Sequence, residues 1–255
     1  MKPNPNNIAN QIKQVLLGFT PITLDDMNHV SLMNRIDTKF IVPISILPAL
    51  LKDVQGNYQV LDINNERVFL YKTEYFDTHD FSMYEAHHNG KLNRFKIRKR
   101  EYVASGKLFL EVKYKNNKRR TIKKRIEKDH HDMSSNESSF IEENSPYKME
   151  ELELKLSNQF YRITLVGSDE RLTIDFDLSF AHGDDKDADF PDAAIIEFKQ
   201  SKFNINSMGM QILKKHGIRP ESCSKYCLGA ASLHTNIKAN RLKQKFELLE
   251  KFKLN

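Results

Sequence analysis

The stretch Arg-Phe-Lys-Ile-Arg-Lys-Arg, residues 94–100, decides the fold of this chain. Successive side chains of a strand point to opposite faces, so four bases share one face and Phe95 and Ile97 begin the other. These four bases are Arg94, Lys96, Arg98 and Arg100. A face exposed to solvent normally mixes both signs of charge. Four bases with no acid between them therefore predict a surface that needs an anion.

The same alternation of charged and apolar residues recurs along the chain and predicts about eight strands. They cover residues 34–42, 67–78, 92–102, 107–115, 120–127, 159–166, 171–180 and 194–199. Their charged faces hold thirteen bases, Arg35, Lys39, Arg94, Lys96, Arg98, Arg100, Lys113, Lys115, Lys123, Arg125, Arg162, Arg171 and Lys199. The acids on these faces are Asp37, Glu111, Asp175, Asp177 and Glu197.

Two architectures fit this pattern. In one, an antiparallel sheet turns an apolar face to the core and a charged face to water. In the other, the sheet closes into a barrel whose charged faces point inward and form a basic channel for a polyanion. Because the bases are so concentrated, we expect the second: an α+β fold with a closed antiparallel β-barrel and helices packed outside.

One domain is expected over residues 1–255, with a helical lead-in at 1–19, a core at about 20–230 and a C-terminal helix at 231–255. We also expect a surface loop at 128–146, a helix at 147–156 and an acidic loop at 182–191. No apolar run is long enough for a membrane helix, and residues 1–13 do not resemble a signal peptide. These features predict a cytoplasmic protein.

The composition limits the chemistry that the chain can perform. The net charge of +6 favours an anionic partner. Two cysteines, Cys223 and Cys227, are too few for a disulfide framework or a structural zinc site. Neither a Walker-type GxxxxGK[ST] loop nor a GxGxxG loop is present. Phosphate would therefore be held by side chains, with arginine providing paired hydrogen bonds and lysine a point charge.

Eight short motifs, in order, resemble those of a known family. They are Arg35-Ile-Asp-Thr-Lys39-Phe-Ile-Val, Tyr75-Phe-Asp-Thr78, the run 94–100 followed by Tyr102, Phe109-Leu-Glu111-Val-Lys113, Thr121-Ile-Lys123-Lys-Arg125, Arg162 in Phe-Tyr-Arg, Ile196-Glu197-Phe-Lys199 and Ser224-Lys225-Tyr226. Over residues 20–230 the chain is similar to the VTC domain, the catalytic domain of vacuolar transporter chaperone polyphosphate polymerases, within the triphosphate tunnel metalloenzyme superfamily.

The resemblance implies an antiparallel tunnel that binds triphosphate with Mn or Mg. The positions that match phosphate-binding motif residues are Lys39, Arg98, Arg100, Lys113, Lys123, Arg125, Arg162, Lys199 and Lys225. Arg94 and Lys96 share the charged face, and Ser224 lies beside Lys225, so we add these three to the phosphate-binding set. We expect catalysis to depend on Arg98, Arg100, Lys123 and Glu197, and a metal to be held by Glu197 with help from Glu111.

Three functions remain open. The first is a polyphosphate polymerase that transfers the γ-phosphate of ATP to a growing polyphosphate chain. The second is a metal-dependent tripolyphosphatase or nucleoside triphosphatase, in which a carboxylate orients water. Hydrolytic relatives resemble Glu-x-Glu-x-Lys where this chain has Arg35-x-Asp37-x-Lys39, which favours the polymerase.

The third function is a non-catalytic module that binds a polyanion. Nucleic acid is not expected as a partner, because binders of nucleic acid usually add exposed aromatic side chains. The expected partners are ATP and polyphosphate, and the sequence identifies no membrane or regulatory partner. If the charged faces meet inside a tunnel, replacing Arg98 or Arg100 by alanine should abolish activity without loss of stability.

Overall fold

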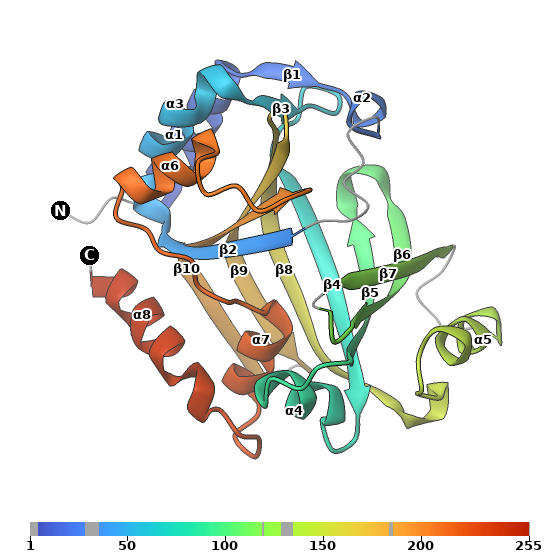
Figure 1. The fold of residues 1–255 in the computed structure, drawn as a ribbon. Helices are drawn as coiled ribbons and strands as arrows, with labels where there is room; N and C mark the ends of the chain where they lie inside the picture. The colour runs from blue at the N-terminus through green and yellow to red at the C-terminus, as the bar shows by residue number, and fades with distance from the viewer. Residues whose placement is uncertain (1–4, 29–35, 119, 129–134, 184–185, 255) are drawn as a thin grey trace.

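A computed structural model describes residues 5–28, 36–118, 120–128, 135–183 and 186–254. Within these residues, ten strands form one large sheet (Figure 1). They are β1 (Thr20–Ile22), β2 (Ile36–Pro43), β3 (Gln59–Leu61), β4 (Phe69–Thr78), β5 (Arg94–Tyr102), β6 (Lys107–Lys115), β7 (Thr121–Lys128), β8 (Leu152–Val166), β9 (Glu170–His182) and β10 (Lys186–Gln200).

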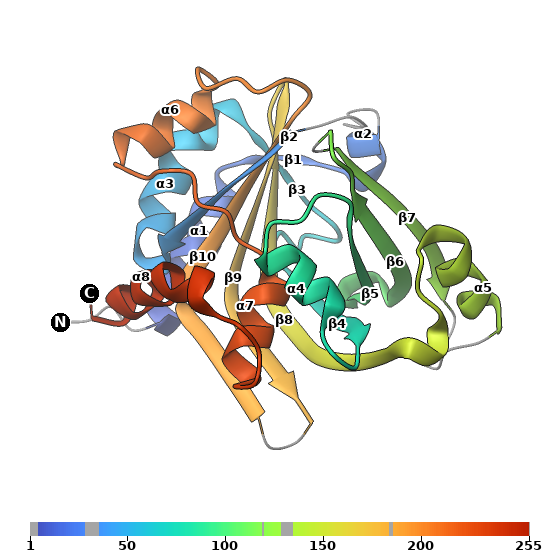
Figure 2. The same cartoon turned by 60° about the horizontal axis from the view of Figure 1, so that its bottom comes forward.

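The main path of the sheet is β2-β10-β9-β8-β4-β5-β6-β7, and every pair along it is antiparallel. β3 pairs with β8, and β1 pairs with β3 in parallel. The sheet is strongly curled, as Figures 1 and 2 show. Among the described residues no pairing joins β2 to β7. The expected sheet is therefore present, but its closure into a barrel is not confirmed, because the two edge strands share no ladder.

The helices are α1 (Pro5–Leu17), α2 (Leu24–Asn28), α3 (Leu47–Val54), α4 (Ser82–His88), α5 (Ser135–Asn144), α6 (Met208–Lys215), α7 (Lys225–Leu233) and α8 (Lys243–Leu254). Five short 3-10 helices accompany them among the described residues, η1 (Ile44–Ile46), η2 (Gln55–Asn57), η3 (Val103–Ser105), η4 (Met149–Glu151) and η5 (Asn240–Leu242). None of the described helices is long and apolar enough to cross a membrane.

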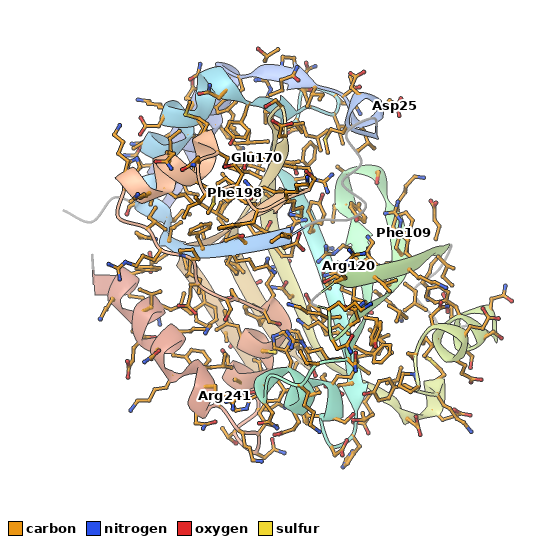
Figure 3. The ribbon with its side chains drawn as sticks, in the orientation of Figure 1. Asp25, Phe109, Arg120, Glu170, Phe198 and Arg241 are labelled. Carbon is orange, nitrogen blue, oxygen red and sulfur yellow. The ribbon has the colours of Figure 1, made fainter. Side chains whose placement is uncertain are left out.

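Apolar side chains on the outer face of β2, β8, β9 and β10 pack against α1, α3 and α6. Phe40, Ile196 and Phe198 belong to this core and are almost completely buried. Phe198, labelled in Figure 3, lies against α6, where a Cβ on Gly209 would come within 2.3 Å of its ring. The close approach of helix and sheet explains the glycine, and the apolar strand face is the one that we expected outside.

A second core fills one end of the curled sheet. Tyr226 and Leu228 of α7 pack there against Phe160 and Phe180 from the inner faces of β8 and β9. Figure 2 shows α7 and α4 side by side in front of this end. α7 therefore closes part of the space inside the sheet and brings its first residue, Lys225, next to the charged strand faces.

Two local expectations are wrong. The helix expected at 147–156 is reduced to the short 3-10 helix η4, because β8 begins at Leu152 and pairs with Thr78 of β4. The acidic loop expected at 182–191 is largely strand, since β9 continues to His182 and β10 starts at Lys186. In both places long cross-strand ladders override weak local propensity. The expected loop at 128–146 also contains α5, whose Ile141 is buried and whose Glu137 forms a buried ion pair with Lys128 of β7.

A β-bulge reverses the side-chain alternation in β9. The register between β8 and β9 shifts between Gln159 and Tyr161, and Asp177 adopts a left-handed φ of 52°. Asp177 is exposed, so its expected place on the inner charged face is wrong. Period-two alternation cannot predict a bulge, because one extra residue moves every later side chain to the other face.

The expected terminal helices correspond to α1 and to α8, which is shorter than predicted. Gly217 follows α6 with a φ of +70°, a left-handed conformation that glycine adopts without strain. Arg35 lies outside the described residues.

Candidate functional site

Strand register gathers the predicted bases on the concave face of the sheet. Lys96 of β5 lies opposite Lys113 of β6, which lies opposite Lys123 of β7. One pair further along, Arg98 lies opposite Glu111, which in turn lies opposite Arg125. Directly opposed side chains are only about 5 Å apart at Cβ, so like charges here repel. The acids on this face must therefore offset a concentrated positive charge.

Glu111 is the first of three carboxylates that bind two bases each. Arg98 donates to Glu111 Oε2 from Nε at 2.7 Å and from Nη2 at 2.5 Å, and Lys123 Nζ donates to Oε1 at 2.7 Å. Glu111 is completely buried and Arg98 is 7% exposed. Burial alone would raise the pKa of Glu111, but Arg98, Lys113 and further bases hold it well below its ordinary value.

Asp175 on β9 is the second carboxylate. Arg162 of β8 donates to its two oxygens at 2.5 and 2.7 Å, and Lys225 at the start of α7 binds the same carboxylate. Burial opposes ionisation, yet Arg162 and Lys225 lower the pKa of Asp175 far below its usual range. Asp175 thus joins α7 to strands β8 and β9. The sequence alone did not predict this role.

Glu197 on β10 is the third carboxylate and is held less tightly. Its distances to Lys39 Nζ and Lys199 Nζ are 3.5 and 3.1 Å, and Lys199 also donates to Thr173 Oγ1 at 2.8 Å. The Glu197 side chain is 16% exposed, compared with 0% for Glu111 and 2% for Asp175. Glu197 is the most accessible of the three carboxylates.

Charges from opposite walls act on one another across the concave face of the sheet. Besides Lys199 and Lys39, the bases Arg162 and Lys113 contribute to the low pKa of Glu197. Glu197 belongs to β10 and Lys113 to β6, which are separated by β9, β8, β4 and β5 in the sheet. They can interact only because the sheet curls. We call this concave surface the tunnel; it is lined by Lys39, Lys96, Arg98, Arg100, Glu111, Lys113, Lys123, Arg162, Asp175, Glu197, Lys199 and Lys225.

Several tunnel bases are crowded without a carboxylate of their own. Arg100 is 6% exposed, and its side chain donates to Thr73 Oγ1 at 3.2 Å and lies over the rings of Tyr71 and Phe160. Among the described residues, Lys113 has neither a hydrogen bond nor an ion pair with a side chain. Burial and the neighbouring Arg98 lower its pKa strongly.

Two more tunnel lysines, Lys96 and Lys199, also have lowered pKa values. Burial lowers the pKa of Lys96 and of Lys199 to about 8 in each case. The positive charge of Lys39 adds to this effect at Lys96, and that of Arg162 adds to it at Lys199, where Glu197 opposes it. The ligand-free tunnel therefore carries more positive charge than its carboxylates neutralise.

The remaining predicted site residues, which we call the rim residues, are Arg94, Arg125 and Ser224, and none of them has an ion pair with the three carboxylates in the described part of the chain. Ser224 is the N-cap of α7, accepting from the Cys227 backbone N–H at 3.3 Å and from Lys96 Nζ at 2.8 Å. Arg94 donates to the Lys91 carbonyl oxygen, and the exposed Arg125 lies over the ring of Phe109, 4.4 Å from its centroid. Phe109 is labelled in Figure 3. These contacts separate the rim residues Arg94 and Arg125 from the three carboxylate clusters.

Tyr75 and Asp77, which lie in a quoted motif, acquire roles only in the structure. The ring of Tyr75 stacks on that of Tyr226, with centroids 5.2 Å apart, beside Arg98 and Arg100. Asp77 is completely buried and accepts from the backbone N–H groups of Met83 and Tyr84 and from the Tyr226 hydroxyl. Asp77 thereby fixes α4 and α7 to β4.

A divalent cation would fit this site only in company with phosphate. No group of three or more histidine, cysteine or carboxylate side chains gathers as metal ligands in the described part of the chain. Mg²⁺ commonly binds through one or two carboxylates plus substrate phosphates and water. Glu197 can provide such a carboxylate. Both oxygens of Glu111 already accept from bases, which suits a counter-ion better than a metal ligand.

The VTC domain matches residues 34–234, which is most of this chain. The chain belongs to the VTC domain family. The tunnel of paired bases and carboxylates therefore lies within the matched family domain. No curated protein matches the chain.

Two solved structures share the fold. One is described as a candidate adenylate cyclase from Bacillus halodurans, with a TM-score of 0.52 and 15% identity over 75% of this chain and 94% of that one. The other is a candidate adenylyl cyclase from Hippeastrum described as having a dominant triphosphatase activity, with a TM-score of 0.51 and 15% identity over 78% and 97% of the two chains. At this identity the likeness establishes the fold alone.

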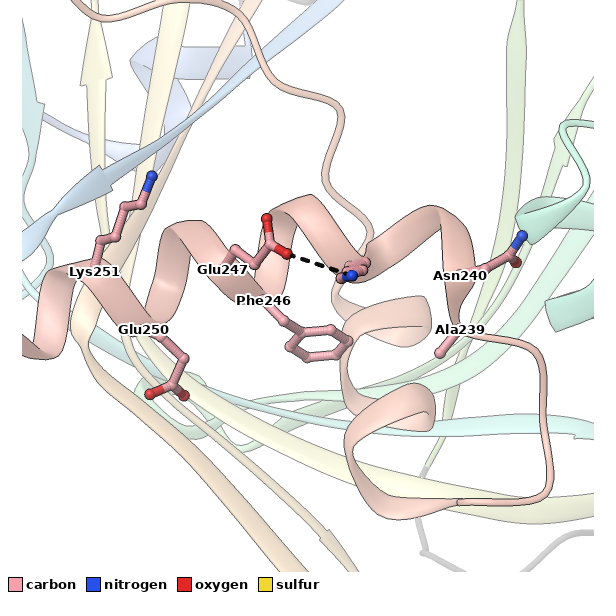
Figure 4. Close-up of a pocket in the computed structure, with 7 residues that line it drawn as sticks. Ala239, Asn240, Phe246, Glu247, Glu250 and Lys251 are labelled. Carbon is pink, nitrogen blue, oxygen red and sulfur yellow. Dashed lines mark ion pairs between the residues drawn. The ribbon is translucent and has the colours of Figure 1, made fainter.

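Away from the tunnel, the described residues also line hollows, of which we consider two. One, of about 690 Å³, follows η5 and α8 and is drawn in Figure 4, where the dashed line marks the 4.0 Å ion pair between Lys243 and Glu247. The other, of about 510 Å³, includes the outward-facing Lys72, Glu74, Lys99 and Glu101. Both lack the clustered bases of the tunnel, so neither replaces it as the candidate site.

Proposed function

We propose that this protein is a polyphosphate-forming phosphotransferase that uses ATP in its basic tunnel. The observation that supports this most is the surplus of buried bases around three carboxylates that are already paired. A chain of phosphates carries closely spaced negative charges that match bases contributed by many strands. Phosphoryl transfer needs positioning and charge neutralisation more than covalent chemistry from the protein.

Each group has a role in this proposal. Arg98, Arg100 and Lys123 stabilise the charge that is spread over the transferred phosphoryl group. Lys39, Lys96, Lys113, Arg162, Lys199, Ser224 and Lys225 hold the remaining phosphates, and Arg94 and Arg125 extend this set at the rim. Glu197 would hold Mn or Mg, which would bridge phosphate oxygens and neutralise their charge.

The low pKa values of the three carboxylates favour a phosphate chain over water as the acceptor of the phosphoryl group. Nearby bases keep the pKa values of Glu111, Asp175 and Glu197 well below their ordinary ranges. A carboxylate with such a low pKa is a weak general base for activating water. The terminal phosphate of a polyphosphate chain is already anionic and needs no such base. This argument supports transfer over hydrolysis.

The test is product analysis after incubation with ATP and MnCl₂. We expect a ladder of long anionic polymer on a gel, and its loss in Arg100→Ala. Lys72→Ala is the matched control, because the Lys72 side chain is 53% exposed on the outer face. Absence of polymer from a wild-type protein that still binds tripolyphosphate would contradict the proposal.

A triphosphatase is the second candidate, and the structural neighbour from Hippeastrum, described with that activity, favours it. The same incubation distinguishes the two functions when orthophosphate is measured together with polymer. Release of orthophosphate from tripolyphosphate faster than polymer formation from ATP would favour the hydrolase. A protein that binds tripolyphosphate but forms neither product would be the non-catalytic polyanion-binding module.

A further inference from the structure

His87 has a buried nitrogen and belongs to α4, a helix that packs on β5, the strand that carries Lys96. Its Nδ1 atom is inaccessible to solvent and has no hydrogen-bond partner among the described residues. Buried polar atoms are normally paired, so an unpaired one requires an explanation. α4 packs on β4, β5 and α7, the elements that form one end of the curled sheet (Figure 2).

The environment of His87 is strongly basic. Lys96 and Arg94 on β5, Lys39 on β2 and Lys115 on β6 all act on the imidazole. Arg94 and Lys115 are directly paired across the two strands, so the bases come from both sides of one ladder. Burial, followed by these four positive charges, lowers the pKa of His87 far below its ordinary value. The imidazole is therefore neutral in the ligand-free protein.

The other charged and ionisable groups on elements packed against α4 have their own partners or lie elsewhere. Asp77 on β4 accepts from α4 backbone N–H groups and Tyr226, and Lys225 on α7 binds Asp175. Arg241 donates to the backbone of His88 and Lys238 lies 3.9 Å from Glu85. Cys227 on α7 has a raised pKa through burial and is a neutral thiol. No carboxylate is among the groups that act on His87 most strongly.

We propose that His87 is a phosphate-binding residue of the tunnel and that it takes up a proton when a polyphosphate or triphosphate chain binds. This deepens the proposed function and rests on it. A bound phosphate cancels the repulsion from the four bases and provides an acceptor for an imidazolium N–H. Neutral His87 limits repulsion in the empty tunnel, and protonated His87 adds one more positive charge to the filled tunnel. Binding should therefore become tighter as the pH falls.

Proton uptake can be measured directly with inorganic tripolyphosphate and no metal. Isothermal titration at pH 6 in buffers of different ionisation enthalpy gives the number of protons taken up. If the pKa of bound His87 returns to about 6.5, the wild type should take up roughly 0.8 proton more than His87→Gln at this pH. Protons taken up by tripolyphosphate itself and by lysine side chains are common to both proteins, so they cancel in this difference.

His79→Gln is the control, because the His79 side chain is 92% exposed and interacts with Glu153. It should take up as many protons as the wild type. Equal uptake by His87→Gln and the wild type, with both binding tripolyphosphate, would overturn the inference but leave the proposed function standing. No binding by the wild type would overturn both.

A second measurement needs no variant. Among the nine histidines, we expect one imidazole carbon resonance of the wild type to stay at its neutral position at pH 6. That resonance should move to the protonated position when tripolyphosphate is added. If every histidine resonance that is neutral at pH 6 stays neutral on saturation, the inference is wrong.

Discussion

Arg98 and Arg100 lie two residues apart on β5 but have different surroundings. Arg98 shares the completely buried Glu111 with Lys123, whereas Arg100 has Thr73 and aromatic rings as neighbours. Removing one partner of a buried ion pair leaves an uncompensated charge, but removing a base crowded by other bases relieves repulsion. The expectation that both alanine variants keep their stability therefore stays our prediction for Arg100, and we revise it for Arg98.

We expect Arg98→Ala to lower the free energy of unfolding by about 2 to 4 kcal/mol, and Arg100→Ala to leave it unchanged or raise it. Both variants should lose activity. Urea denaturation without ligand measures the difference, and Lys124→Ala, on the outer face of β7, is the control. Equal destabilisation by the two arginine variants would show that Arg100 also has a structural role.

Lys96 gives a prediction about pH. Its pKa is about 8 in the folded protein, while an unfolded lysine has a pKa near 10.4. Between these values the unfolded state binds more protons, so this group makes stability rise with pH. We expect Lys96→Met to be more stable than the wild type at pH 7 by about 1 to 2 kcal/mol. The advantage should disappear above about pH 10.

Thermal or urea unfolding from pH 7 to 10 tests this expectation, with Lys72→Met as the exposed control. A Lys96→Met protein less stable than the wild type at pH 7 would mean that the hydrogen bond to Ser224 outweighs the repulsion.

At the scale of elements, α4 and α7 depend on one carboxylate. Asp77 accepts from the first turn of α4 at 2.9 and 2.8 Å and also binds the hydroxyl of Tyr226. Tyr226 follows Lys225, which reaches Asp175 in the tunnel. The position of Lys225, which we propose binds phosphate, therefore depends on an aspartate that belongs to β4.

We expect Asp77→Ala to lower the free energy of unfolding by about 3 kcal/mol or more, because a buried charged acceptor of several hydrogen bonds is lost. At temperatures where it remains folded, the KM for ATP should rise because Lys225 is displaced. Asp80→Ala is the control, since Asp80 is exposed and binds Thr78. Denaturation curves and steady-state kinetics together give both results. Identical behaviour of the two variants would rule out Asp77 as the anchor of α7.

At the scale of the whole molecule, the excess of tunnel bases makes stability depend on anions. A ligand that binds only the folded state raises the unfolding free energy by RT ln(1 + [L]/Kd), which is about 2.7 kcal/mol at one hundred times the Kd. Tripolyphosphate should therefore raise the Tm by several degrees, and NaCl should reduce this increase. Arg100→Ala should show a smaller increase than Lys124→Ala. A Tm that does not respond to tripolyphosphate would contradict a polyanion site.

Some features of this fold follow from local sequence patterns, and others depend on contacts between residues that are far apart in the chain. Alternation is a local property, so residues 94–100 correctly predicted β5 and its basic face, and the alternation over 107–115 and 120–127 correctly predicted β6 and β7. The same rule failed at Asp177, because a bulge depends on pairing with β8. Family motifs pointed to Arg98, Glu111 and Glu197, but not to Asp175 as the partner of Arg162 and Lys225, which come from β8 and α7.

By itself, the sequence determined that strands with one basic and one apolar face would form a sheet with a concentrated positive charge on one side. Burial and period-two geometry are sufficient for that conclusion. Only the tertiary structure decided how strongly the sheet curls, which lets the charge of Lys113 act on Glu197. It also decided that α7 closes one end of the curled sheet and that four bases act on His87. Those outcomes depend on charges far apart in the chain, whose interaction falls with distance in space and not with separation in sequence.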